Sequence, residues 1–372
     1  MANEDKATRY HRLQRRASLL ATAAVAALLL ILLITGASAA IRTQAERATA
    51  GHFVFTVFGY VVVVFVLNEL VQVPFAYYQG VVLERRYGLS TETHQHWWKN
   101  HVKAAALGLG FAAVAALLVI ALIRWSPERW WLVGAFTFVA ILIGLAQLSP
   151  VLLLPLFYDF TPLNRPELVN RLVALADRAG ARVVGVFEWR LSDRTRKANA
   201  ALAGIGRTRR ILLSDTLLAE HSDEEIEVIL AHELAHHVHR DIWSAIALET
   251  VLITAGFFAA DRALSLFGTA FALRDKADVA GLPILLIAAG TVSILFLPLA
   301  NGLSRAHERR ADRYALTLTQ NADAFITAMK RLAAQNLAEE QPSPLIEWLL
   351  HSHPSTQSRI DAARRWLVEE GR

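Results

Sequence analysis

The sequence of 372 residues contains no cysteine and only 19% charged residues. The absence of cysteine excludes disulfides and thiolate metal ligands, so histidine and carboxylate side chains would have to hold any transition metal. The low charge content accompanies 54% apolar residues and a mean hydropathy of +0.35. A chain this apolar is typical of a membrane protein rather than of a soluble one.

The net charge of +5 and the pI near 9.6 raise the question of nucleic acid as a partner. The basic residues do not gather in one patch, however. They lie beside long apolar runs, a pattern typical of loops that contact anionic lipid. We therefore expect a lipid bilayer as the partner and no nucleic acid.

Six apolar stretches are long enough to cross the hydrocarbon core of a bilayer as helices, which takes about 20 residues. They are residues 17–41, 53–83, 104–123, 130–157, 242–260 and 279–303. The first could instead be a cleaved signal peptide, because "ITGASAA" offers a small-residue cleavage pattern. Its apolar part is longer than the usual segment of about 7–15 residues, which favours an uncleaved anchor.

Basic residues predict how the chain crosses the membrane. Five of them precede the first span: Lys6, Arg9, Arg12, Arg15 and Arg16. Because cytoplasmic segments carry the excess of lysine and arginine, we expect the N-terminus in the cytoplasm. Six spans return the chain to the same side, so the C-terminus and the charged segment 159–241 are expected there too. The expected location is a bacterial inner membrane.

The stretch "SDEEIEVILAHELAHHVHRD", residues 222–241, packs four histidines near the end of a predicted helix. The helix begins with a capping signature, Ser222 followed three residues later by Glu225. His237 and His239 project away from the other two histidines, and we interpret them as solvated or interfacial side chains.

His232 and His236 are four residues apart and therefore project from one face of this helix, one turn above the other. Glu233 follows the first of them. This is the H-E-x-x-H pattern, in which two imidazoles hold zinc and the glutamate acts as general base. The pattern by itself also occurs by chance.

A catalytic zinc site needs a third protein ligand. The stretch "SRAHERRADRYA", residues 304–315, offers Glu308 and Asp312, of which one can bind the metal while the other holds a ligand histidine. Alternatively, both acids pair with neighbouring arginines on a solvated helix. Topology favours the metal site, because the two spans between His236 and Glu308 return the chain to the same membrane face.

Two of the predicted spans carry an acid, Glu69 and Glu249. An acid inside a span is costly and usually faces protein or a water-filled interior. We expect both to line a polar intramembrane cavity beneath the metal. The alternative is that each is a buried, hydrogen-bonded acid that fixes helix packing.

Seven segments, in order along the chain, resemble those of the type I CAAX prenyl endopeptidases, integral-membrane zinc metalloproteases to which the membrane heat-shock metalloproteases are related. They are "VVLERRYGLSTET", "PLFYDFTPL", "RKANAALAG", "RRILLSDTLL", "HELAHHVHRD", "SRAHERRAD" and "HSHPSTQSRI". The resemblance covers most of the chain. One departure is that the eukaryotic members of the family have seven spans, whereas six are predicted here.

The resemblance implies one Zn²⁺ per chain, bound by His232, His236 and Glu308, with Asp312 behind a ligand. Glu233 would then take a proton from the attacking water and deliver it to the leaving amine.

The resemblance also implies that His353 and Arg359 lie near the metal as further catalytic residues. It places Asn199 and Ala200 on an exposed edge strand with which the substrate backbone pairs. From the residues alone, His353 could equally be a turn residue, and the segment around Asn199 a small-residue loop.

These patterns predict a mainly α fold: a polytopic membrane protein of about six transmembrane helices with a cytoplasmic zincin-like catalytic domain that contains a small β-sheet. The expected parts are a membrane region of four spans (1–158), a catalytic insertion with the H-E-x-x-H helix (159–242), two further spans (243–302) and a C-terminal catalytic segment (303–372).

Three functions remain open. The first is an endopeptidase of the CAAX type, acting on peptide or protein substrates that are prenylated or membrane-embedded. The second is a protease of the heat-shock type that removes damaged membrane proteins. The third is a membrane scaffold or transporter with a vestigial metal motif, which the intact set of His232, Glu233, His236 and Glu308 disfavours.

Overall fold

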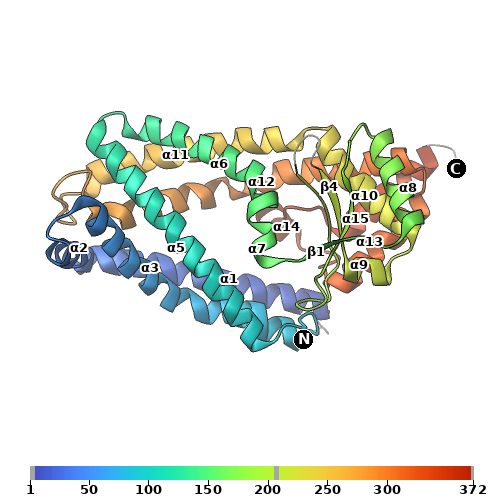
Figure 1. Ribbon diagram of the computed structural model, residues 1–372, viewed down its shortest axis with the longest axis horizontal. Helices are drawn as coiled ribbons and strands as arrows, with labels where there is room; N and C mark the ends of the chain where they lie inside the picture. The colour runs from blue at the N-terminus through green and yellow to red at the C-terminus, as the bar shows by residue number, and fades with distance from the viewer. Residues whose placement is uncertain (1–4, 205–208, 370–372) are drawn as a thin grey trace.

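The computed structural model describes residues 5–204 and 209–369, and it divides into a long bundle of helices and a lobe that contains a sheet (Figure 1). Within the described residues, six helical segments are long and apolar enough to cross a membrane, which confirms the predicted number of spans. They are α1 (Lys6–Ile34), α3 (Phe53–Tyr77) continued by the π-helix η1 (Tyr78–Leu83) and α4 (Glu84–Arg86), α5 (His94–Trp125), α6 (Trp130–Leu152), α11 (Asp241–Phe267) and α12 (Leu282–Thr319).

Two predicted span ends were wrong. The first span ends at Ile34 rather than at Ile41, because Gly36 has a φ of 74° and starts a separate helix, α2 (Ala37–Ala48). A left-handed residue interrupts the helical hydrogen-bond pattern, and glycine adopts this conformation without steric cost. The fourth apolar run, 130–157, is likewise not a single helix. α6 ends at Leu152, and a separate short helix, α7 (Leu154–Phe157), follows it.

The sheet of the second lobe has four strands in the order β1-β2-β4-β3. They are β1 (Phe160–Pro162), β2 (Gly185–Trp189), β3 (Ala200–Ala203) and β4 (Arg210–Ser214). β2 and β4 are parallel, whereas the two outer strands pair antiparallel with their neighbours. β3 therefore lies at one edge of the small sheet that the sequence predicted.

Helices cover this sheet and enclose the core of the lobe. They are α8 (Pro166–Arg178), α9 (Asp215–Glu220), α10 (Asp223–Val238), α13 (Ala322–Asn336) and α15 (Thr356–Glu369). Leu234, Phe325 and Trp366 are buried in this core, and side chains of this size contribute about 1.5–3 kcal/mol each on burial.

α10 and α12 pack against each other, and both helices carry fully buried small side chains, Ala231 and Ala311. The remaining short helices are η3 (Val279–Gly281), at the start of α12, and α14 (Pro344–Leu350), which packs on α12. α12 continues without interruption from the membrane bundle into the lobe, so one rigid element joins the two parts (Figure 1).

Candidate active site

α10 presents the two histidines of the H-E-x-x-H pattern from a helix with a well-defined start. The hydroxyl of Ser222 accepts a hydrogen bond from the backbone N–H of Glu225, whose carboxylate accepts one from the N–H of Ser222. This capping box satisfies two of the backbone groups left unpaired at a helix N-terminus. At the other end, Arg240 has a φ of 56° and turns the chain directly into α11.

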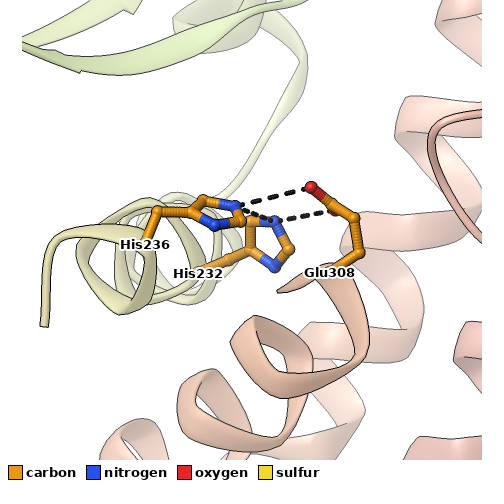
Figure 2. Close-up of side chains that lie close together, drawn as sticks. All are labelled: His232, His236 and Glu308. Atoms are coloured by element: carbon orange, nitrogen blue, oxygen red, sulfur yellow. Dashed lines mark hydrogen bonds and ion pairs between the residues drawn. The ribbon is translucent and has the colours of Figure 1, made fainter. Parts of the chain in front are cut away.

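Glu308 of α12 meets the two histidines of α10, and all three side chains point toward one another (Figure 2). The two Nε2 atoms of His232 and His236 lie 3.3 Å apart. Glu308 places Oε2 3.2 Å from Nε2 of His232 and Oε1 3.5 Å from Nε2 of His236. His232 and Glu308 are buried, whereas His236 is partly exposed.

A carboxylate fixes the orientation of each imidazole from its far side. Nδ1 of His232 lies 2.9 Å from Oδ1 of Asp312, and Nδ1 of His236 lies 2.9 Å from Oδ2 of Asp241. A neutral imidazole that donates its Nδ1–H to a carboxylate keeps a lone pair on Nε2. Both lone pairs therefore face a third acceptor, the carboxylate of Glu308.

Three acceptors that converge without a donor repel one another unless a cation lies between them. The distances fit such a cation, because donor atoms about 2.0–2.1 Å from a tetrahedral zinc lie about 3.3–3.4 Å from each other. The separation of 3.3 Å between the two Nε2 atoms matches this value, and each of them lies 3.2–3.5 Å from one of the two carboxylate oxygens of Glu308. The donor set of two nitrogens and one oxygen also suits zinc.

The charges around His232 favour a cation in this position. Burial lowers the pKa of its imidazole, but the hydrogen bonds to Asp312 and Glu308 outweigh burial and raise that pKa to about 9. Without a metal ion, the site is therefore expected to bind a proton at neutral pH. Binding of a metal would displace it.

Glu233 follows His232 on α10 and occupies a partly buried position beside the three converging side chains. Burial raises the pKa of its carboxyl above the ordinary value. A carboxyl with a raised pKa binds and releases a proton closer to neutral pH than an exposed glutamate does.

Two residues of the C-terminal segment reach this cluster from different sides. Nδ1 of His353 lies 2.9 Å from Oε2 of Glu308, and the imidazole is largely exposed. Arg359 of α15 lies on the far side of His232 from Glu308. Its Nε and Nη2 donate to the two oxygens of Asp312 at 2.9 and 2.5 Å. Its guanidinium therefore contacts the carboxylate that orients His232, on the Nδ1 side of the ring.

A cavity of 1290 Å³ opens beside the cluster and is lined by His353, Arg359 and Asn199 together with the N-terminal half of α1. The backbone of Asn199 exchanges hydrogen bonds with Ser214, and Ala200 pairs with Leu213 at the start of β3. The edge strand expected to carry Asn199 and Ala200 therefore begins at this cavity.

The two intramembrane acids occupy different places. Glu249 lines a cavity of 870 Å³ among the spans, whose other lining residues are mostly aliphatic and aromatic. Glu69 is not among the lining residues; its carboxylate lies 3.0 Å from Nε2 of His101 on α5.

Asp241 is a site residue that the sequence reasoning did not identify. Its buried carboxylate contacts His236 and also forms an ion pair with Arg310. The available signal was its place directly after "HELAHHVHR", at the first position of the next helix, where an acid is favourable.

Comparisons with known proteins agree with this geometry. Residues 162–367 match the family model described as peptidase family M48, and residues 2–159 match the one described as the CAAX prenyl protease N-terminal region with five membrane helices. Four of the six candidate spans fall in that N-terminal region, together with the shorter α2.

Similar proteins come from bacteria and from eukaryotes. An uncharacterized metalloprotease, YhfN of Bacillus subtilis, is 32% identical, and the alignment covers 89% of this chain and 78% of that protein. CAAX prenyl protease 1 of Saccharomyces cerevisiae is 30% identical over 80% of this chain and 69% of that protein.

The crystal structure of S. mikatae Ste24p has the same fold, with a TM-score of 0.83, 24% identity, and coverage of 96% of this chain and 87% of that one. The family match spans the whole catalytic lobe and includes the H-E-x-x-H helix. The chain therefore belongs to peptidase family M48 and is an integral-membrane metalloendopeptidase with a membrane region of the CAAX prenyl protease type.

Proposed function

We propose that this protein is a zinc-dependent endopeptidase that cleaves membrane-tethered peptides or proteins at the cytoplasmic face of a bacterial inner membrane. The convergence of His232, His236 and Glu308 at separations suited to a tetrahedral ion, with Glu233 beside them, is the observation that carries the proposal. In this assignment the three residues bind the metal. Asp312 and Asp241 hold the histidines in the tautomer that exposes Nε2.

Zinc bound here would supply a Lewis acid that polarises the scissile carbonyl and lowers the pKa of a water molecule. Glu233 takes the proton of the attacking water as the bond from oxygen to the carbonyl carbon forms. It then delivers that proton to the amide nitrogen as the carbon–nitrogen bond breaks. The raised pKa of Glu233 suits both transfers, because a group that must accept and return a proton works best with a pKa near the ambient pH.

His353 and Arg359 take different parts in the proposed mechanism. The exposed imidazole of His353, against Glu308 and at the mouth of the cavity, is placed to donate a hydrogen bond to the oxyanion of the tetrahedral transition state. Arg359 holds both oxygens of Asp312 and thereby positions His232, and it also lines the cavity beside the site.

Substrate binding is assigned to the edge strand β3 and the cavity of 1290 Å³. A strand edge offers unpaired backbone groups with which an extended peptide can pair. Asn199 lies at the start of that edge and lines the same cavity as His353. The cavity also reaches Leu19 of α1 and Ile294 of α12, which belong to membrane spans, so an anchored substrate can approach from the bilayer.

The orientation follows from the charges of the first span. Its basic N-terminal segment supports a cytoplasmic N-terminus, and the six candidate spans of the described residues, an even number, support the same side for the C-terminus and the catalytic lobe. Cysteine-accessibility labelling tests this assignment cleanly, because the natural chain has no cysteine of its own.

The decisive experiment compares the wild type with Glu233→Gln, both purified in detergent and analysed for zinc, on matched peptides with and without a farnesylated cysteine. We expect both proteins to hold one zinc and only the wild type to cleave. A requirement for the lipid would identify a CAAX-type activity. Cleavage that ignores the lipid would indicate the removal of damaged membrane proteins, and a zinc-free, inactive wild type would refute the proposal.

A further inference from the structure

We propose that Arg305 and Asn301 of α12 are positioning residues for His353: they hold the C-terminal end of α14 and thereby fix the segment that carries this histidine beside Glu308. The proposal rests on the proposed function, in which His353 acts on the substrate. It assigns a role to two buried polar side chains that lie on the metal-ligand helix but do not touch the metal site.

Both side chains donate to backbone carbonyls of one short segment. Nη1 of Arg305 lies 2.8 Å from the carbonyl oxygen of Glu347 and 2.6 Å from that of His351, with Trp348 more distant at 3.4 Å. Nδ2 of Asn301 lies 2.7 Å from the carbonyl oxygen of Leu349. These four carbonyls belong to the last turn of α14 and to the residue directly after it.

The carbonyls at a helix C-terminus have no partner within the helix and carry partial negative charge. α14 has only seven residues, and a helix so short does not persist by its own hydrogen bonds. Arg305 and Asn301 of α12 supply the hydrogen-bond donors that the carbonyls of its last turn lack. At the other end of the loop, the backbone N–H of Ser355 lies 3.3 Å from the carboxylate of Glu347.

Both side chains are buried, so each has lost water as a hydrogen-bond partner and needs partners within the protein. Arg305 is 9% exposed and Asn301 is 8% exposed. A buried guanidinium without partners is strongly unfavourable, so the carbonyls that it contacts also determine where it can lie. Arg305 and Asn301, together with the carbonyls that they contact at the end of α14, thus form a clamp that holds α12 and α14 together.

The clamp bears on catalysis because the chain beyond α14 carries His353. This histidine is two residues beyond His351, and its side chain is 61% exposed, so burial does not hold it in place. Apart from its contact with Glu308, the position of His353 depends on the backbone that leads to it. Arg305 precedes Glu308 by three residues on the same helix, so α12 carries the metal ligand and the anchor of His353 in one rigid frame.

Kinetics of a double-mutant cycle test the proposal. Arg305→Ala is expected to lower kcat by about 10–100-fold with KM changed less than about threefold, because a misplacement of roughly 1 Å at a catalytic group costs up to about 100-fold. In a His353→Ala background the same change should lower kcat by less than about threefold. Arg305→Lys should recover part of the loss, since one ammonium can still reach a carbonyl. Arg309→Ala, an exposed arginine one turn further along α12, is the matched control and should leave kcat unchanged.

Equal losses of kcat in the two backgrounds would overturn the proposal, because they would show that Arg305 does not act through His353. Bound zinc is measured on every variant. A loss of zinc from Arg305→Ala would likewise overturn it, because the residue would then support the metal site instead.

A spectroscopic measurement keeps the test independent of the proposed function. A single cysteine at Ser352, spin-labelled in the full-length protein, reports the motion of this segment, and a label at Thr327 on α13 is the control. Arg305→Ala and Asn301→Ala should sharpen the spectrum of the first label and leave the second unchanged. An unchanged spectrum at Ser352 would refute the clamp even in an active enzyme. If the wild type proves inactive, the proposed function fails, and a sharpened spectrum would still establish the clamp.

Discussion

Asp241 is expected to set the metal affinity through His236. Its Oδ2 lies 2.9 Å from Nδ1 of the imidazole and fixes both the ring orientation and the tautomer. Loss of such a carboxylate partner weakens metal binding by about 10–100-fold, which corresponds to about 1.4–2.8 kcal/mol. We expect this whole loss of metal affinity because His236 is partly exposed, with 29% of its side chain accessible, so packing alone does not hold the ring.

The assay is a zinc titration of the metal-free protein against a chromophoric chelator. We expect the affinity to fall from wild type to Asp241→Asn and further to Asp241→Ala, because the amide can accept a hydrogen bond but supplies no charge. Arg310→Ala is the matched control. It removes the other partner of Asp241, is half-exposed, and should change the affinity less than Asp241→Ala does.

Asp241 makes a cleaner test than Asp312, although both carboxylates contact a histidine. Asp312 is buried and also neutralises Arg359, whose side chain is only 15% exposed, and removing one partner of a buried ion pair costs about 3–5 kcal/mol of folding free energy. The partner of Asp241 is near the surface, so the lobe should remain folded. Zinc affinity of Asp241→Ala within about twofold of wild type, in a folded protein, would refute the reasoning.

Three other outcomes are expected. Because the pKa of His232 is raised to about 9 in the metal-free site, zinc binding at pH 7 should release a proton and strengthen as pH rises toward 9, which calorimetry in buffers of different ionisation enthalpy measures. The raised pKa of Glu233 means that its ionised form destabilises the metal-free fold. Glu233→Gln should therefore raise Tm at neutral pH, and the gain should vanish as pH falls through about 4.5, where the unfolded chain also protonates. Arg240→Gly should raise the free energy of unfolding by about 1 kcal/mol, because φ is 56° there, and denaturant titration measures this.

The sequence predicted those site residues whose placement depends on regular geometry. His232 and His236 are one turn apart on any helix, and the parity of the spans returns Glu308 to the same membrane face. Asp241 escaped prediction because five residues on a continuous helix would place it about 140° around from His236. The left-handed Arg240 ends the helix and directs the carboxylate toward the imidazole instead. For the same reason, the zinc helix does not continue unbroken into the fifth span.

The contacts between segments far apart in the chain could not be predicted from the sequence either. The resemblance brought Arg359 to the metal site, but only the docking of α15 against α12 and α13 shows that its guanidinium faces Asp312. Glu69 and Glu249 looked alike as lone acids in apolar runs. The structure separates them, because His101 on α5 lies against the first and a cavity lies against the second.

The length of α12 sets the depth at which cleavage can occur. Its apolar run ends at Leu303, and Glu308 comes five residues later on the same uninterrupted helix, so it lies about 7.5 Å further along the axis. If that run crosses the hydrocarbon core, this distance equals the headgroup layer, which is about 5–8 Å thick on each side. A peptide bond that reaches Glu233 must then come to the outer boundary of the headgroup layer. Chains anchored in the membrane by a lipid or a span bring such bonds there at little entropic cost, whereas a folded soluble protein would first have to unfold a segment.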